Sequence, residues 1–132
     1  MILVDTSVLI DFLKGRETGK TMKFEYILGN EIPFGISNLI YQEVLQGART
    51  EQEYDSLNVY LRSQRFYELK FGMQSYESAA RMYCLCRSKG ITVRSTVDLL
   101  VAETAIENEL YLLHDDMDFT NLAGFISELR EY

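Results

Sequence analysis

Short apolar runs alternate with helical patterns along this chain, and that alternation is the strongest constraint on its fold. Five runs have the length and composition of strands: Met1–Val4, Pro33–Ile36, Phe66–Leu69, Leu110–Leu113 and Phe125–Leu129. Helical periodicity and capping residues predict helices between them, over residues 7–14, 18–28, 38–46, 51–63, 75–88 and 96–107. Strands separated by helices predict an α/β fold, in which helices cover both faces of a mainly parallel sheet.

The length and composition are those of one globular domain. The chain has 132 residues, of which 47% are hydrophobic, and we expect a single domain over residues 1–132. No apolar run is long enough to span a bilayer, and no basic segment precedes the first strand, so we expect no signal peptide and a cytoplasmic location. Cys84 and Cys86 have no metal-ligand partner at zinc spacing, which favours two reduced thiols.

The charge is unevenly distributed. The formal net charge of −7 argues at first against a nucleic-acid partner. The segment from Arg62 to Arg94, however, carries a net +5, and the remainder carries −12. This segment either binds a polyanion or only solvates helix faces, and both readings stay open. If it binds RNA, the best candidates for phosphate contacts are Arg81, Arg87, Lys89 and Arg94.

Four acidic residues are expected where strands end and helices begin. Asp5 follows the first strand, and Glu43 lies one turn into the helix after the second strand. Asp98 lies in the first turn of a helix, and Asp116 follows the strand Leu110–Leu113. In a parallel sheet this carboxyl edge is where ligands bind. Taken singly, each acid has a plainer explanation as a helix cap or a partner of the helix dipole.

Clustered carboxylates repel one another and are tolerated mainly when a cation lies among them. Carboxylate oxygens suit Mg²⁺ or Mn²⁺. Such an ion polarises a phosphate and activates water, so hydrolysis of a phosphodiester is the natural chemistry. No serine–histidine or cysteine–histidine pair competes strongly, because His114 is the only histidine.

Four motifs, in their order and spacing, resemble those of the PIN domain. They are "VDTSVLIDFL", "ISNLIYQEVLQGA", "VDLLVAETA" and "LLHDDMDF". The match is closest to the toxin ribonucleases of VapBC toxin–antitoxin pairs. The resemblance implies a three-layer α/β/α sandwich with four or five strands. It also implies a Mg²⁺- or Mn²⁺-dependent endoribonuclease that leaves a 3′-hydroxyl and a 5′-phosphate, is usually a homodimer, and is inhibited by a cognate antitoxin.

The resemblance also assigns roles to individual residues. The metal-site acids of the family match Asp5, Glu43, Asp98 and Asp116; Asp5, Asp98 and Asp116 would hold the metal, and Glu43 would complete the site or orient the water. Ser7 would donate a hydrogen bond into the site, and Asp118 matches an auxiliary acid of the last motif. The family often has Thr or Ser where this chain has His114, so Asp115 stays an alternative to Asp116.

Three other functions remain to be weighed against a ribonuclease. A PIN-like domain that binds RNA or a partner without cutting would have the same fold. A receiver-type signalling module would also bring acids and Mg²⁺ to the sheet edge, but the third strand leads into "ELKFG", which offers Lys70 and no phosphate-accepting aspartate. An aspartyl phosphatase needs an acid two residues after Asp5, where the chain has Ser7.

Overall fold

Helices and strands alternate along the whole chain in the computed structural model, which describes residues 1–132. Five strands form the sheet: β1 (Ile2–Val4), β2 (Phe34–Ile36), β3 (Arg65–Phe66), β4 (Tyr111–Leu113) and β5 (Arg130–Glu131). Seven helices connect them: α1 (Thr6–Leu13), α2 (Gly19–Gly29), α3 (Asn38–Leu45), α4 (Glu51–Arg62), α5 (Met73–Ser88), α6 (Thr96–Glu107) and α7 (Met117–Ala123).

The five strands form one parallel sheet in the order β3-β2-β1-β4-β5. Strand β1 is central, with Ile2 paired to Phe34 of β2 on one side and to Tyr111 of β4 on the other. Gly35 permits the close approach of β3, because a Cβ there would lie 2.5 Å from the carbonyl oxygen of Arg65. The predicted α/β class and the expected strand number are confirmed.

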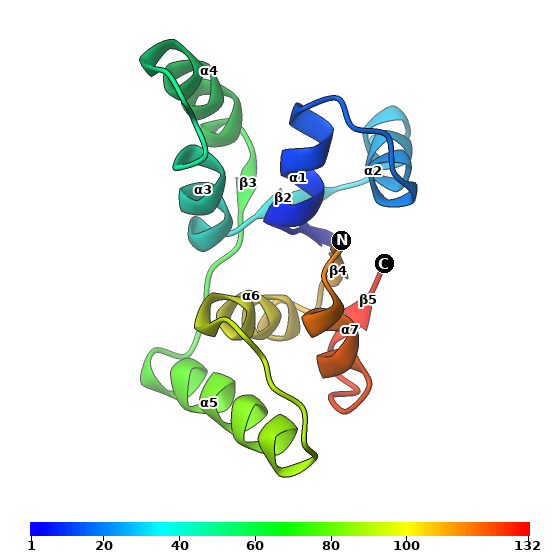
Figure 1. Cartoon of the computed structure of the whole chain (residues 1–132), viewed down its shortest axis with the longest axis vertical. Coiled ribbons are helices and arrows are strands. Elements are labelled where there is room, and N and C mark those ends of the chain that lie inside the picture. The colour runs from blue at the N-terminus through cyan, green and yellow to red at the C-terminus, as the bar shows by residue number, and fades with distance from the viewer.

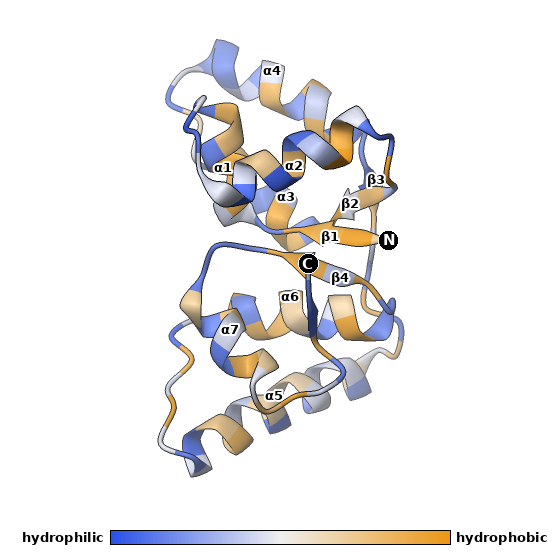
Figure 2. Cartoon of the chain, turned by 90° about the vertical axis from the view of Figure 1, so that its right-hand side faces the viewer, coloured by the Kyte–Doolittle hydropathy of each residue, from blue (hydrophilic) through white to orange (hydrophobic).

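The helices form a layer on each face of the sheet. Helices α1 to α4 cover one face, and α5, α6 and α7 cover the other (Figures 1 and 2). Helix α6 lies between the sheet and α5 (Figure 1). Two helices connect β1 to β2, two connect β2 to β3, and the chain crosses to the other face after β3. This is the three-layer sandwich that the family resemblance implies.

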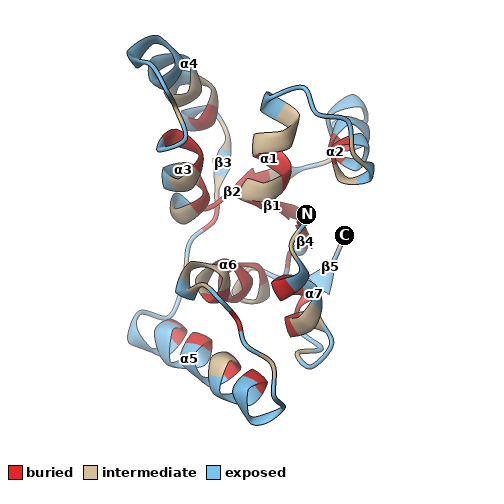
Figure 3. Ribbon diagram, viewed as in Figure 1, coloured by how far each residue is buried: buried red, intermediate tan, exposed pale blue.

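The core lies between each helical layer and the sheet, where the buried faces of the helices turn inward (Figure 3). Leu3 and Val4 of β1 and Leu112 and Leu113 of β4 are completely buried. Parallel strands covered on both faces are apolar throughout rather than alternating, which is why they stand out in the sequence. None of the helices has the length and apolar character needed to cross a membrane.

Two strand predictions need correction. The run Phe125–Leu129 is not a strand, because the N–H groups of Phe125 and Ile126 donate to the carbonyl of Leu122 and extend the end of α7; the last strand follows at Arg130–Glu131. The third strand is Arg65–Phe66 rather than Phe66–Leu69, since its neighbour β2 ends at Ile36. Helix α7, which has only seven residues, was not predicted as an element of its own.

Candidate active site

The carboxyl ends of β1 and β4 are held together at the point where the strand order reverses. The chain runs from β1 outward to β3 on one side, and from β4 to β5 on the other, so the strand order reverses between β1 and β4. In open parallel sheets, ligands bind outside the carboxyl ends of the strands at such a point. The backbone N–H of Asp5 donates to the carbonyl of Leu113 at 2.9 Å. Asp5 therefore leaves β1 at this point of the sheet edge, with 5% of its surface exposed.

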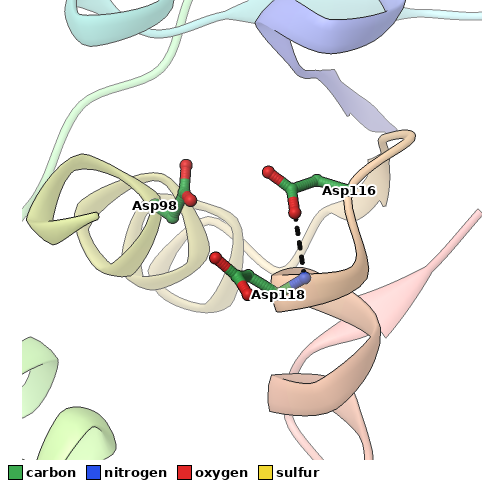
Figure 4. Close-up of side chains that lie close together, drawn as sticks. All are labelled: Asp98, Asp116 and Asp118. Carbon is green, nitrogen blue, oxygen red and sulfur yellow. Dashed lines mark hydrogen bonds between the residues drawn. The ribbon is translucent and has the colours of Figure 1, made fainter. Parts of the chain in front are cut away.

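Three aspartates from α6 and the start of α7 converge at this edge of the sheet. Each of Asp98, Asp116 and Asp118 offers one carboxylate oxygen, and these three oxygens lie within 4.8 Å of one another. The side chains approach from the first turn of α6 and from the start of α7 (Figure 4). Asp116 caps α7, since its Oδ1 accepts from the N–H of Asp118 at 2.9 Å. Asp118, expected to be auxiliary, is thus part of the central group.

Ser7 joins the two strand ends. Its Oγ donates to Oδ2 of Asp5 at 2.7 Å and accepts from the N–H of Asp115 at 3.0 Å. Burial raises the pKa of Asp5, while the hydrogen bonds from Ser7 counteract that rise. Asp115 is exposed and contributes a backbone contact, whereas Asp116 lies with Asp98 and Asp118. Of these two neighbouring acids, only Asp116 has its carboxylate in the cluster with Asp98 and Asp118.

Glu43 reaches the site from the opposite helical layer. It lies on α3, and its Oε1 accepts from the hydroxyl of Thr6 at 3.0 Å. The pKa of Glu43 lies above its ordinary value, mainly because burial raises it. The hydrogen bond from the Thr6 hydroxyl opposes this rise, and the charge of nearby Asp5 adds to it. The contact with Thr6 was not predicted from the sequence. Its only signal there is that Thr6 and Glu43 both follow strands that were expected to belong to one mainly parallel sheet.

The pKa of Asp98 is affected by the charges of the other acids at this edge. Its pKa is raised to about 7, first by burial and then by the charges of Asp116, Asp5, Asp118 and Glu43. Asp5, Glu43, Asp116 and Asp118 thus all lie within electrostatic reach of Asp98. A cation would remove the repulsion and favour the ionised form of Asp98. An all-carboxylate donor set is the kind that Mg²⁺ and Mn²⁺ accept, so the residues fit a divalent cation.

Arg94 is the one candidate for RNA binding that contacts the acids. Its Nε lies 3.2 Å from Oδ2 of Asp118, and its Nη2 lies 3.6 Å from Oδ1 of Asp116. Hydrogen bonding to Asp118 and the charges of both acids raise the pKa of Arg94. The side chain is 74% exposed, so it lies at the rim of the site rather than within it.

The other basic candidates lie on or just after α5. Arg81 is exposed on α5 and lines a shallow hollow with Glu103 and Glu128. The guanidinium of Arg87 lies over the ring of Tyr83, and the ammonium of Lys89 lies over the ring of Phe125, each 5.5 Å from the ring centroid. None of the three is paired with an acid.

A mainly apolar hollow of about 300 Å³ lies apart from the acids, between α1, α3 and α4. Its apolar lining comes from Ile10, Leu13, Val44, Leu57 and Tyr60. It contains no cluster of acids or nucleophiles, so we place the chemistry at the carboxyl edge of the sheet.

Comparison with known proteins gives one family over nearly the whole chain. The sequence profile of the PIN domain matches residues 2–125. The curated relatives include VapC ribonuclease Mb1587 of Mycobacterium bovis and ribonuclease VapC11 of Mycobacterium tuberculosis. Each is 27% identical to this chain over 124 residues, which make up 93% of this chain and 92% of the relative.

Solved structures share the fold at lower identity. VapBC2 from Rickettsia felis, bound to a DNA fragment from its promoter, aligns with a TM-score of 0.74 and 17% identity, covering 100% of this chain and 98% of that one. VapBC-1 from nontypeable Haemophilus influenzae aligns with a TM-score of 0.72 and 20% identity, covering 100% and 97%.

Proposed function

Because the chain belongs to the PIN domain family, we propose that it is a divalent-cation-dependent endoribonuclease and the toxin of a type II toxin–antitoxin module. One observation carries the proposal: five acids from four segments meet where the strand order of the sheet reverses. The curated relatives named VapC ribonuclease support it over 93% of the chain. In this proposal residues 1–132 form one PIN domain.

Asp5, Asp98 and Asp116 are the proposed protein ligands of the cation, with Asp118 beside them. Asp98 and Asp116 are already grouped with Asp118, and Asp5 lies within electrostatic reach of Asp98. When bound, Mg²⁺ or Mn²⁺ would polarise the scissile phosphate and lower the pKa of an attacking water. We favour these ions because the donors are all carboxylates.

The chain's own residues would orient the water and balance charge. Glu43 is held through Oε1 by Thr6, which leaves its second oxygen to accept a hydrogen bond from the attacking water. Ser7 fixes Asp5 by donating to Oδ2, so the other carboxylate oxygen is presented in a defined direction. The resemblance to the PIN family implies that hydrolysis of the phosphodiester would leave a 3′-hydroxyl and a 5′-phosphate.

RNA would be held by the positive segment rather than by the acids, which repel it. The cation neutralises only the scissile phosphate, so flanking phosphates need lysine or arginine. Arg94 is the proposed contact nearest the site, since it borders Asp116 and Asp118. Arg81, Arg87 and Lys89 are exposed on and after α5 and would contact phosphates farther away.

A cognate antitoxin is the proposed partner in the inactive state. The solved relatives from Rickettsia felis and Haemophilus influenzae are VapBC proteins. Clustered carboxylates attract a guanidinium, whose planar fork matches their geometry, and Arg94 already makes such contacts from this chain. An antitoxin arginine would therefore suit this site. We also propose that the chain is a homodimer and acts in the cytoplasm.

Cleavage of RNA with and without the cation tests the proposal. We expect cleavage with Mg²⁺ or Mn²⁺, none in EDTA, and severe loss in Asp5→Asn, Asp98→Asn and Asp116→Asn. Because the acids act as a unit, a double variant should lose little more than a single one. Asp55→Asn, on the exposed part of α4, is the matched control and should keep full activity. Full cleavage in EDTA would contradict the cation mechanism, and binding without cleavage would favour the non-cleaving alternative.

A further inference from the structure

A buried histidine connects the last strand to the acidic group. His114 directly follows β4 and is 2% exposed. Its Nδ1 lies 3.1 Å from the backbone nitrogen of Asp116, and its Nε2 lies 2.7 Å from Oε2 of Glu131 in β5. The same oxygen of Glu131 also accepts from the hydroxyl of Thr120 at 3.1 Å. The imidazole therefore bridges a residue of the site and a residue of the edge strand.

The contacts of the ring determine its tautomer. A backbone N–H can only donate, so Nδ1 has to be the acceptor for Asp116 and cannot carry a proton. The proton of the neutral ring is then on Nε2, where it is donated to the carboxylate of Glu131. Glu131 thus selects the tautomer that can receive the Asp116 N–H. This is the arrangement by which a carboxylate orients a histidine in many sites.

We propose that Glu131 and His114 are positioning residues, which fix the Asp116 backbone and so aim its carboxylate at the cation. Asp116 needs such a constraint because it is the cap residue of a helix of only seven residues and lies between β4 and α7. Its extended backbone, with φ −137° and ψ 125°, places Oδ1 against the N–H of Asp118. Holding the Asp116 N–H thus positions two of the three clustered aspartates.

Packing supports a fixed ring rather than a mobile one. The ring of His114 lies 5.0 Å from that of Phe119, which is fully buried on α7. Because the ring packs against Phe119 and both ring nitrogens are hydrogen-bonded, the side chain of His114 is held in one rotamer. His114 is the only ionisable side chain that pairs with Glu131, and the hydroxyl of Thr120 holds the same carboxylate oxygen in place.

The tautomer is tested first, on the cation-free chain. His114 is the only histidine, so a long-range ¹H–¹⁵N spectrum contains a single imidazole and needs no assignment. We expect the pattern of a neutral ring protonated on Nε2 and unprotonated on Nδ1. In Glu131→Ala we expect a mixture of tautomers, while Glu131→Gln, which keeps an acceptor oxygen, should restore the Nε2–H form. A ring protonated on Nδ1 in the unsubstituted chain would overturn the proposal.

Binding of Mn²⁺ is tested next, by titration without RNA. Losing a direct hydrogen-bond partner of a metal ligand typically weakens metal binding by about 10-fold or more. Glu131 acts one contact farther out, through His114, so we expect Mn²⁺ binding to weaken by about threefold or more in Glu131→Ala but not in Glu131→Gln. Glu128→Ala removes an exposed charge from the same segment without touching His114, and its affinity should be unchanged. Equal affinities in Glu131→Ala and Glu128→Ala would overturn the proposal.

A second pair of variants separates positioning from loss of packing. His114→Asn and His114→Gln both remove the ring, so their cost in stability is similar. Only Asn places an oxygen at the position of Nδ1, where it can accept from Asp116, so we expect it to bind Mn²⁺ at least about threefold more tightly than Gln. Equal Mn²⁺ affinities of His114→Asn and His114→Gln would contradict this inference but not the proposed function. Since the inference rests on the proposed cation site, an unsubstituted chain that binds no Mn²⁺ would overturn both.

Discussion

Arg94 and Asp118 are joined by two hydrogen bonds to one oxygen: the backbone N–H of Arg94 donates to Oδ2 of Asp118 at 3.3 Å, and its Nε donates at 3.2 Å. The loop before α6 is thereby tied to α7 beside the acids. The guanidinium partly neutralises Asp116 and Asp118 in the absence of a cation. An arginine at this position opposes the binding of a metal cation and favours the binding of a phosphate. Its removal should therefore change the affinities for cation and RNA in opposite directions.

Arg94→Gln should therefore strengthen cation binding and weaken RNA binding. Removing the positive charge deepens the negative potential at Asp116 and Asp118, so we expect Mn²⁺ to bind about 2- to 5-fold more tightly. On an Asp5→Asn background, RNA affinity should fall and its dependence on salt should become shallower. Arg16→Gln, whose arginine pairs with Asp11 on the surface, should change neither quantity. A parallel loss of both affinities would mean that Arg94 acts only by holding the loop.

Asp98→Asn should stabilise the cation-free chain at neutral pH. The folded-state pKa of Asp98, about 7, lies above the usual value of 3.8, so the folded chain binds a proton that the unfolded chain releases. Stability contributed by this protonation is present at low pH and is lost as pH rises from about 4 to 7. We expect a loss of about 1–2 kcal/mol, after screening by solvent around this half-buried group.

Denaturation in EDTA across pH 4–8 measures this effect. The free energy of unfolding of Asp98→Asn should depend less on pH across that range. The stabilisation by Mg²⁺ at pH 7 should also be smaller in this variant, because the cation binds only the folded state. Asp55→Asn again serves as the control. If Asp98→Asn destabilised the cation-free chain and left the Mg²⁺ effect intact, the acids would not repel one another as inferred.

Ser7→Ala should weaken both the fold and the site. The substitution removes one hydrogen bond to Asp5 and one from Asp115, which together stabilise the folded chain by about 1–2 kcal/mol. Without the hydroxyl, burial should raise the pKa of Asp5 further, so Mn²⁺ affinity at neutral pH should fall. Ser88→Ala, which loses a hydroxyl contact to the Leu85 carbonyl at an exposed helix end, should leave Mn²⁺ affinity unchanged. The measurements are urea denaturation and Mn²⁺ titration, and equal results for the two variants would contradict the bridging role of Ser7.

Glu103→Gln should stabilise the chain at pH 8 without affecting the site. Glu103 is a buried residue of α6 beside Met82 and Leu85 of α5. Burial and then its hydrogen bond and repulsion with Glu107 raise its pKa to about 7. Oε2 of Glu107 is buried and has no other partner, so a proton on Glu103 satisfies both groups. Stability from this proton is present near pH 4 and is lost as pH rises to about 7.

Thermal unfolding at pH 5 and pH 8 checks this prediction. The amide of Gln donates at both values, so the variant should melt higher than the unsubstituted chain only at pH 8. Its Mn²⁺ affinity should not change, because Glu103 is not among the charges that perturb Asp98. A higher melting temperature at both pH values would indicate better packing rather than relief of a buried charge.

The sheet was predictable because its strands are covered on both faces. The continuous apolar runs at β1, β2 and β4 are typical of buried parallel strands. The acids that follow these runs in the sequence indicate the carboxyl edge of the sheet. Strands β3 and β5 were misplaced because each has only two residues and lies at an edge of the sheet, where exposed polar residues such as Arg65 and Arg130 carry no hydrophobic signal.

The contacts within the site were less predictable than its members. The positions of Asp5, Glu43 and Asp116 follow from strand ends, and that of Asp98 from a helix start. Which carboxylates meet depends on helix rotation and on the turn into α7. That turn brings Asp118 into the central group. Arg94 was expected near the active edge from its position before α6, yet its pairing with Asp118 depends on a loop that carries no periodic pattern.

The central position of β1 has a consequence for when this chain becomes active. Asp5 is made among the first residues of the sequence shown, but Asp98, its nearest partner along the chain on the other helical layer, is 93 residues away. Strand β1 can pair with β2 early, and only later with β4. A growing chain therefore has an incomplete acidic group until residues 98–118 have left the ribosome. A nuclease site built from these acids is completed only after most of this domain has been made.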